Sequence, residues 1–372
     1  MSHIVIAGGG TGGHIYPGLA VAKVLIDRGH QVDWVGAVGG LEEKIVAREG
    51  LPLHLIKIGK LHHTVGFWTR LKTVFGFPFA FFQAVRLVLK LKPTAVLGVG
   101  GFASGPFLFV ASLLGKRTVI WEPNAKAGMT NRMLAKIVDE ILLVFEEAAK
   151  DLPGRHVHRV GLPVRSTIAP VERAPLKGRP FRILAFGGSQ GARAINKAVA
   201  AWVSSDLWSE NLELVHQTGR YDFEETKKVY SDLVAKGRKI NVTCLEYLHD
   251  MDARYAWADL IICRAGASTA AELAASGKAS ILVPLPSAAD DHQLKNAKVF
   301  ENSSAAVVIE QKNLTVESLS RAVTAFQEDP VLVERFEHAV RKFASPRAAE
   351  VIADHVLGEE IFSKEIFGKG TK

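Results

Sequence analysis

A glycine-rich segment near the N-terminus is the first part of the sequence with an evident chemical use. It reads GGGTGGH from Gly8 to His14, after a short apolar run and before an amphipathic stretch. A glycine loop between a strand and a helix lets the backbone approach a ligand, and N–H groups at the helix start attract phosphate or carboxylate. We expect an anion site here, with the His14 imidazole beside it as a candidate general base. A helix cap or a phosphate contact is the alternative role of His14.

The same glycines also fit a dinucleotide-binding fingerprint. Gly8, Gly10 and Gly13 match the GxGxxG spacing, and Asp33 lies 20 residues after Gly13, where a ribose-binding acid can stand. However, the residues after Asp33 place it inside a strand, and His14 occupies a position where a dehydrogenase usually has a small or apolar residue. A dinucleotide-dependent oxidoreductase is therefore kept only as an alternative.

A second glycine loop and a third element lie in the other half of the chain. The loop GGSQGAR covers residues 187–193 and adds serine and glutamine donors, and residues 264–269 open a helix that carries Glu272. Ser268 or Thr269 can be a simple N-cap with Glu272 as its capping-box partner. Taken together, a helix start for phosphate and an acid for ribose hydroxyls indicate a nucleotide-sugar site.

Composition and charge limit the class of protein. At 372 residues the chain exceeds the size of a single core, and its 48% apolar and 23% charged residues are typical of globular proteins. Two cysteines outside any CxxC spacing exclude a disulfide framework and a zinc finger, which favours a reducing cytoplasm. The net charge of +8 lies entirely in residues 1–163, with 19 basic against 11 acidic residues. This asymmetry predicts an anionic partner.

The apolar pattern alternates between short β-rich runs and amphipathic stretches, which predicts βα units and parallel sheets. The expected class is α/β, with two Rossmann-like, doubly wound domains. We expect strands at Ile4–Ala7, Gln31–Val35, Ala95–Val99, Thr118–Trp121, Arg182–Phe186, Glu213–Gln217, Asn241–Leu245, Leu260–Cys263 and Ala279–Pro284. We expect helices at Leu19–Arg28, Leu41–Arg48, Phe107–Leu114, Met129–Ala135, Ala192–Val203, Phe223–Ala235 and Ser268–Ser276.

The rhythm restarts after Gly161-Leu162-Pro163, which divides the chain. We predict a first domain at 1–163, a second at 164–342, a helix at about 343–358 and a polar tail at 359–372.

The uncharged stretch 93–115 contains two prolines and five glycines, so we reject it as a membrane span. The N-terminus has no basic region before its apolar run and is not expected to be a secretory signal.

Seven motifs of this chain resemble those of glycosyltransferase family 28, and in particular of its peptidoglycan N-acetylglucosaminyltransferases. The resemblance covers about residues 3–300. The motifs are GGGTGGHIYPGLA at 8–20, GVGGFASGP at 98–106, EPNAKAG at 122–128, GLPVR at 161–165, GGSQGARAIN at 187–196, YAWADLIICRAGASTAAEL at 255–273 and DDHQLKNA at 290–297.

This resemblance implies the GT-B architecture, in which two Rossmann-like domains face each other across a cleft, with the last helix crossing back to the first domain. It implies transfer from UDP-N-acetylglucosamine to lipid I, giving lipid II, at the cytoplasmic face of the inner membrane. An epimerase of UDP-N-acetylglucosamine with the same fold is an alternative. Nucleic acid is not expected as a partner, whereas other cell-wall synthesis proteins are. Trp121 and Pro123 depart from the family pattern, where His and Gln are expected.

The resemblance also assigns site residues. Donor sugar and diphosphate would contact Thr11, Gly12, Gly13 and Asn124; UDP would be held by Arg165, Ser189, the Leu248 backbone, Ala267, Ser268, Thr269, Ala270, Ala271 and Glu272; and the sugar hydroxyls would be bound by Gln293.

An inverting transfer needs a base for the acceptor hydroxyl and stabilisation of the leaving diphosphate. His14 is the candidate base and Glu122 the second candidate. Asp250 and Asp252 form a DxD, the metal-diphosphate motif of single-domain glycosyltransferases, and Asp290-Asp291 is another acidic pair. We interpret Asp250 and Asp252 as helix caps, and expect no metal and no cofactor.

The segment 61–93 combines seven aromatic residues with five cations, and its longest uncharged run is too short to cross a bilayer. Aromatic side chains among cations are typical of elements that lie on anionic lipid. We predict peripheral membrane attachment, because the lipid acceptor is itself anchored there. The alternative is that these aromatics fill the core of the first domain. The residues expected to insert are Phe75, Phe79 and Phe82, and those expected to bind lipid phosphates are Arg70, Lys72 and Arg86.

Overall fold

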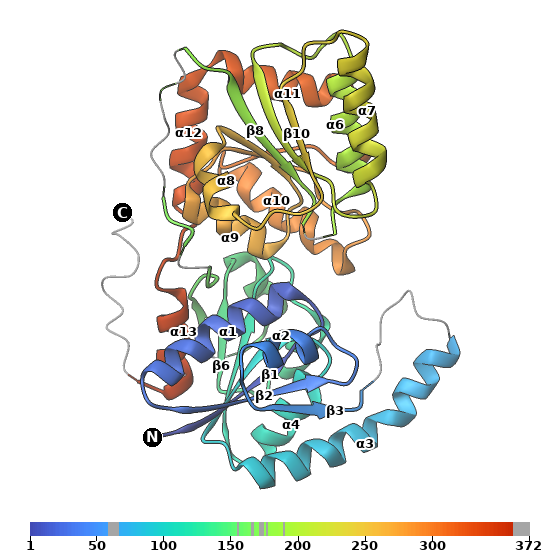
Figure 1. Ribbon diagram of the computed structural model, residues 1–372. Helices are drawn as coiled ribbons and strands as arrows, with labels where there is room; N and C mark the ends of the chain where they lie inside the picture. The colour runs from blue at the N-terminus through green and yellow to red at the C-terminus, as the bar shows by residue number, and fades with distance from the viewer. Residues whose placement is uncertain are drawn as a thin grey trace. The chain divides into compact units, whose positions relative to one another are not determined.

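The computed structural model describes residues 1–58, 67–154, 156–164, 167–170, 175, 178–188 and 190–359, and only the backbone of 67–77 and 289. The predicted tail from 360 onward therefore lies outside the described residues. The chain divides into two units (Figure 1). Unit 1 comprises Met1–Pro163 and the C-terminal segment from Pro346, and unit 2 comprises Val164–Ser345.

Unit 1 is built on a seven-stranded parallel sheet with the order β3-β2-β1-β4-β5-β6-β7. Its strands are β1 (His3–Gly8), β2 (Gln31–Ala37), β3 (Leu53–Ile56), β4 (Ala95–Gly100), β5 (Arg117–Glu122), β6 (Glu140–Leu143) and β7 (Val157–Arg159). Its helices are α1 (Gly12–Asp27), α2 (Glu42–Arg48), α3 (Phe67–Leu91), α4 (Ser104–Leu113), α5 (Met129–Leu134), α13 (Ala348–Leu357) and the 3₁₀ helix η1 (Glu146–Asp151).

Unit 2 repeats this plan with a six-stranded parallel sheet in the order β10-β9-β8-β11-β12-β13. Its strands are β8 (Phe181–Phe186), β9 (Leu212–Gln217), β10 (Val242–Leu245), β11 (Leu260–Cys263), β12 (Ser280–Leu282) and β13 (Val307–Val308). Its helices are α6 (Arg193–Ser204), α7 (Phe223–Ala235), α8 (Met251–Trp257), α9 (Ala267–Ser276), α10 (His292–Asn302), α11 (Val316–Glu328), α12 (Pro330–Arg341) and the 3₁₀ helices η2 (Ala289–Asp291) and η3 (Gln311–Asn313). The predicted α/β class with two parallel sheets is confirmed.

The central strand β1 shows why the sheets are parallel and covered on both faces. Five of its six residues are buried, so both faces of the strand need a covering layer. Val5 and Ala7 pack in a core that includes Ala84 of α3 and Phe107 of α4. On the opposite face, an apolar pocket joins Leu97 and Trp121 of the sheet to residues of α1 and α13. Helices thus cover each face, as crossover connections require.

The C-terminal helix α13 is fixed to unit 1 by a polar cluster at the start of β5 and β6. The Arg117 guanidinium donates to the His355 carbonyl through Nη2 at 2.8 Å and pairs with Glu140. Glu140 also contacts His355 Nδ1 at 2.7 Å, and the His158 ring packs on His355. Because Arg117 and His355 share this carboxylate, the cluster anchors α13 to the sheet. The positive charge of Arg117 would also repel a metal ion at Glu140.

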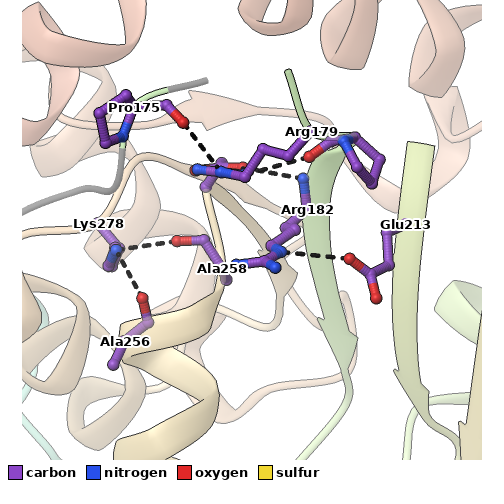
Figure 2. A network of polar contacts seen from close by, with 9 residues as sticks. Pro175, Arg179, Arg182, Glu213, Ala256, Ala258 and Lys278 are labelled. Carbon is purple, nitrogen blue, oxygen red and sulfur yellow. Dashed lines mark hydrogen bonds and ion pairs between the residues drawn. The ribbon is translucent and has the colours of Figure 1, made fainter. Parts of the chain in front are cut away.

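In unit 2, a buried ion pair ties the segment before β8 to the start of β11. Arg179 donates two hydrogen bonds to Asp259, with N–O distances of 2.6 and 2.7 Å, and the Arg182 backbone N–H donates to the same carboxylate. Figure 2 shows Arg179 beside Arg182, whose side chain contacts Glu213 of β9. Asp259 is only 1% exposed, and it raises the pKa of Arg179 by hydrogen bonding.

We predict that Arg179→Ala destabilises unit 2 by about 3–5 kcal/mol, because it leaves the buried Asp259 charge without its partner. Urea unfolding followed by the fluorescence of the buried Trp202 and Trp208 measures this change. The control is Lys298→Ala, which removes a solvent-exposed pair with Glu301. An equally small loss for both variants would contradict the prediction.

Candidate active site

Both glycine loops lie at the point where the strand order of their sheet reverses. In unit 1 the chain leaves β1 into the loop beside β4, and the Gly9 N–H donates to the Gly100 carbonyl at 3.1 Å. In unit 2 the corresponding neighbours are β8 and β11. Doubly wound sheets bind ligands outside the carboxyl ends of the strands at such a switch point. Each unit therefore offers one candidate site, built on the loop that the sequence singled out.

His14 is placed by the first turn of α1, whose N-cap is Thr11. Its Nδ1 lies 3.2 Å from the Gly9 carbonyl oxygen and 3.4 Å from the Thr11 hydroxyl. A Cβ atom on Gly100 would lie 3.2 Å from Nε2, so the ring lies against the loop after β4. The histidine is partly exposed, as are Gly12 and Gly13, and Thr11 is exposed. The predicted base thus stands at the switch point of unit 1.

Glu42 is a residue of this site that sequence reasoning missed. It begins α2, is 1% exposed and accepts hydrogen bonds from the backbone N–H groups of Gly10 and Ala37, each at 2.8 Å. A Cβ atom on Gly9 would lie 2.2 Å from its carboxyl carbon, so only glycine leaves room for this carboxylate. The sequence signal was a glutamate preceded by glycines at 36 and 40, which also make room for it.

Glu122, the second candidate base, ends β5 and is buried. One carboxylate oxygen accepts from the Asn124 backbone and side chain, and the other accepts from the Gly128 N–H and from the Asn131 amide at 2.9 Å each. Burial raises the pKa of Glu122, while these donors oppose the rise. A carboxylate surrounded by four N–H donors holds the loop 123–128 in shape, and this geometry favours His14 as the base.

Three residues near Glu122, namely Trp121, Pro123 and Asn124, bear on earlier expectations. Trp121, which departs from the family pattern, is buried and donates its indole N–H to the Gly161 carbonyl at 3.2 Å. Its neighbour Asn124 is partly exposed and folds back on Glu122. The Trp121 departure therefore changes the core of unit 1. Pro123 is buried as well.

In unit 2 the second glycine loop packs directly on the backbone after β9. A Cβ atom on Gly191 would lie 1.8 Å from the Thr218 carbonyl oxygen, and its φ of 77° is in the left-handed region that favours glycine. The Gly191 N–H closes a turn on the Gly188 carbonyl at 2.9 Å. The predicted ligands Ser189 and Arg165 lie outside the described residues.

The start of α9 differs from the capping-box alternative. Its N-cap is Gly266, so neither Ser268 nor Thr269 caps the helix, and Glu272 instead accepts a hydrogen bond from the Tyr255 hydroxyl at 3.0 Å. That alternative was wrong because the helix begins at Ala267, which places Ser268 and Thr269 two and three residues after the N-cap. The first-turn N–H groups of a helix without a side-chain cap are available to an anion.

The other predicted contacts of unit 2 lie in α9 itself, in the loop after β10 and in the first turn of α10. Ala267 and Ala270 are buried under the sheet side of α9, and Ala271 is partly exposed. Leu248 is mostly buried, and the Gln293 side chain accepts from the Leu285 N–H at 3.1 Å, after β12.

The acidic pairs have local partners. Asp250 is the N-cap of α8 but makes no capping hydrogen bond; it pairs with Arg254 at 3.0 Å, and Asp252 lies in the first turn. The predicted cap position is therefore confirmed for Asp250, although it makes no capping hydrogen bond, and the prediction is wrong for Asp252. Asp290 and Asp291 precede α10 with left-handed φ values of 52°.

Asp33 is unsuited to bind ribose, which removes the support for the oxidoreductase. Its carboxylate is buried in the first half of β2 and contacts both His3 and His54. Burial opposes ionisation, but the two histidines hold the pKa of Asp33 below its ordinary value.

Comparisons with known proteins decide the family. The model described as glycosyltransferase family 28 N-terminal domain matches residues 4–143, and the family 28 C-terminal domain model matches residues 182–352. The chain belongs to glycosyltransferase family 28. Among family members, the UDP-N-acetylglucosamine–N-acetylmuramyl-(pentapeptide) pyrophosphoryl-undecaprenol N-acetylglucosamine transferase of Bdellovibrio bacteriovorus is 44% identical over 95% of this chain and 98% of its own. The transferase of the same name from Myxococcus xanthus is 41% identical over 95% of this chain and 92% of its own.

Solved structures agree with this family assignment. The crystal structure of Acinetobacter baumannii MurG has a TM-score of 0.81 and 32% identity, covering 96% of this chain and 100% of that one. A Listeria monocytogenes structure titled as a putative UDP-N-acetylglucosamine 2-epimerase has a TM-score of 0.66 at 12% identity, covering 96% of this chain and 97% of that one. The latter likeness shows a shared fold alone. The predicted GT-B fold class is confirmed for this family 28 chain.

We predict that Glu122→Gln lowers the stability of this family 28 protein by about 1–3 kcal/mol, because the new amide N–H₂ faces backbone donors that need an acceptor. Thermal unfolding measures the loss. Glycosyl transfer by the folded variant should keep the pH dependence of the parent. A variant with unchanged stability and no turnover would instead make Glu122 the base.

Proposed function

We infer that this protein transfers N-acetylglucosamine from UDP-N-acetylglucosamine to the C4 hydroxyl of the N-acetylmuramoyl unit of lipid I, which gives lipid II. The observation that carries this proposal is the 44% identity over 358 residues to a transferase named for the reaction. Anion-attracting glycine loops at both switch points support it, because donor and acceptor each contain a diphosphate.

UDP is proposed to bind unit 2. The N–H groups of Ala267, Ser268 and Thr269 in the first turn of α9 would hold the diphosphate, helped by the loop 187–191. Glu272, one turn further along and oriented by the Tyr255 hydroxyl, would accept from the ribose hydroxyls. The growing negative charge on the leaving UDP is stabilised by these fixed dipoles, so the proposed mechanism needs no metal or cofactor.

His14 of unit 1 is proposed to take the proton from the acceptor hydroxyl as this oxygen attacks the anomeric carbon. The Gly9 carbonyl can only accept, so its hydrogen bond needs the proton of the neutral ring on Nδ1. The basic lone pair is then on Nε2, the nitrogen that lies on the side of Gly100. A histidine side chain is suited to this task, because an imidazole can accept and release a proton near neutral pH.

The test is a transfer assay with labelled UDP-N-acetylglucosamine and a short-chain lipid I analogue, scored for the disaccharide product. We predict that His14→Ala lowers kcat by about 10²–10⁴-fold, the scale of a general base, with UDP binding retained. Full turnover by His14→Ala would reject this base. Interconversion of the free nucleotide sugar without acceptor would indicate an epimerase.

We further propose that unit 1 attaches peripherally to the cytoplasmic leaflet through α3. Phe79 and Phe82 are 52% and 66% exposed, and Val85 and Leu89 continue the same stripe at helical spacing. The core alternative is therefore wrong for these two phenylalanines; Ala80, Ala84 and Val88 of α3 face the core instead. The side chains of Phe75, Arg70 and Lys72 lie outside the described residues.

Cations and further apolar side chains extend this stripe. Arg86 and Lys90 are exposed on the same helix. Helix α4 packs beside α3, with Phe109 in edge-to-face contact with Phe81, and it exposes 70% of Leu113. Among the described residues, no helix combines the length and hydropathy that crossing a bilayer would require. An exposed apolar stripe with flanking cations fits an element that lies on anionic lipid.

Liposome flotation tests this attachment. Binding should increase with the fraction of anionic lipid and decrease with salt, and Phe79→Ser combined with Phe82→Ser should release the protein while turnover of a soluble acceptor is retained. The control is Leu207→Ser with Val234→Ser, which removes two exposed apolar side chains from unit 2. Equal flotation of the parent and the Phe79/Phe82 variant would exclude this helix as the membrane-binding element.

A further inference from the structure

The peptide group between Gly9 and Gly10 lies between a buried carboxylate and the His14 imidazole. Its N–H, on Gly10, donates to Glu42 Oε2 at 2.8 Å. Its carbonyl, on Gly9, is 3.2 Å from His14 Nδ1. One planar peptide group thus hydrogen-bonds to Glu42 at one end and to His14 at the other, and because the group is rigid, fixing the N–H also fixes the direction of the carbonyl.

The Glu42 carboxylate is itself held firmly. Its second oxygen accepts from the Ala37 N–H at the end of β2, so the carboxylate links the loop after β1 to the end of the neighbouring strand. Cβ atoms on Gly36 and Gly40 would lie 2.5 and 2.4 Å from the Glu42 side chain. Three glycines, counting Gly9, therefore surround a side chain that is almost fully buried.

Both carboxylate oxygens are needed because both partners are N–H donors. A glutamine has the same shape but only one acceptor oxygen, so its amide N–H₂ would face either Gly10 or Ala37. An aspartate is one methylene shorter. The site is thus specific for a glutamate.

We propose that Glu42 is a positioning residue for His14, acting through the Gly9–Gly10 peptide to hold the imidazole as its Nδ1–H tautomer with Nε2 as the basic nitrogen. A negative charge on the N–H side polarises the peptide and strengthens the carbonyl as an acceptor. The arrangement resembles the carboxylate that orients a catalytic histidine in a triad, with a peptide group inserted between the two. The role of this relay in turnover rests on the proposed function, whereas the relay itself does not.

The tautomer of His14 is measured directly by ¹⁵N NMR of histidine-labelled protein. The chain contains 13 histidines, so the His14 signals are assigned by their loss in His14→Gln. In the parent at a pH where the ring is neutral, we expect the Nδ1–H form, whereas a histidine in water favours the Nε2–H form. An Nε2–H tautomer in the parent would overturn the proposal without any variant of Glu42.

Glu42→Gln should shift His14 toward the Nε2–H form and lower kcat by about 10–100-fold, the scale of groups that orient a functional histidine. UDP affinity should be retained, since UDP is proposed to bind unit 2. The control is Glu43→Gln, which alters the adjacent carboxylate, whose partner is the Gly39 N–H. Its His14 tautomer and its kcat should match those of the parent.

The outcomes separate this proposal from the proposed function. If the His14 tautomer stays unchanged in Glu42→Gln, the proposed relay from Glu42 through the peptide to His14 is rejected. Any loss of activity in this variant is then assigned to a disturbed fold. If the tautomer shifts while His14→Ala keeps full turnover, the relay stands and the role of His14 as the base fails. If Glu42→Gln does not fold, an Nε2–H tautomer in the parent still rejects the proposal.

Discussion

The candidate site of unit 1 depends on backbone packed against backbone with no side chains in between. A Cβ atom on Gly8 would lie 2.2 Å from the Gly100 carbonyl oxygen, and one on Gly101 would lie 2.6 Å from the Gly9 carbonyl oxygen. This contact brings the loops after β1 and β4 together at the switch point. The peptide groups of this loop form hydrogen bonds with the side chains around it. Trp34 donates its indole N–H to the Gly8 carbonyl at 2.9 Å, and Glu42 and His14 contact the two ends of the Gly9–Gly10 peptide group.

Unit 2 meets the same constraint with a different set of polar side chains. Gly191 and Gly219 pack on the backbone of each other's loops, and the Asn196 amide donates to the Thr218 carbonyl at 2.8 Å. Behind this contact, His216 bonds to the Tyr230 hydroxyl at 2.8 Å and to Asn196. Burial lowers the pKa of His216 to about 3, so the ring is neutral here. The second glycine loop is thus supported by Asn196, which connects a neutral histidine to the Asp222 carboxylate, whereas the first is supported directly by the Glu42 carboxylate.

The features that the sequence predicted well were those with a local signal. Glycine runs between a β-rich and a helical stretch identified both loops, and buried apolar runs identified the central strands. The edge strands β3 and β7, and the short strand β6 between β5 and β7, were missed, because runs of three or four residues with polar neighbours such as His54 and Glu140 do not stand out from loops.

Residues whose role depends on distant partners were harder to predict. Glu42 looked like any acidic residue in the first turn of a helix, since the glycines around it come from the loop after β1, from β2 and from the turn that follows β2. Glu122 was a second candidate base because the sequence does not show that its carboxylate accepts from the loop after β5 and from Asn131 of α5. Phe79 and Phe82 could not be separated from core residues until the register of α3 on α4 was known. His14 differs from these residues, because its position directly after the glycines already placed it in the first turn of α1, beside the loop.

Unit 1 is assembled from two stretches of chain that are separated by all 182 residues from Val164 to Ser345. At a synthesis rate of about 5–20 residues per second, α13 leaves the ribosome roughly 10–40 s after the first stretch. During that interval the apolar pocket shared by Trp121, Pro17 and Ile352 lacks its last wall. Folding of unit 1 is therefore completed only after α13 has been synthesised. A chain that stopped before Pro346 would hold every proposed site residue and still expose the part of its first sheet that α13 covers.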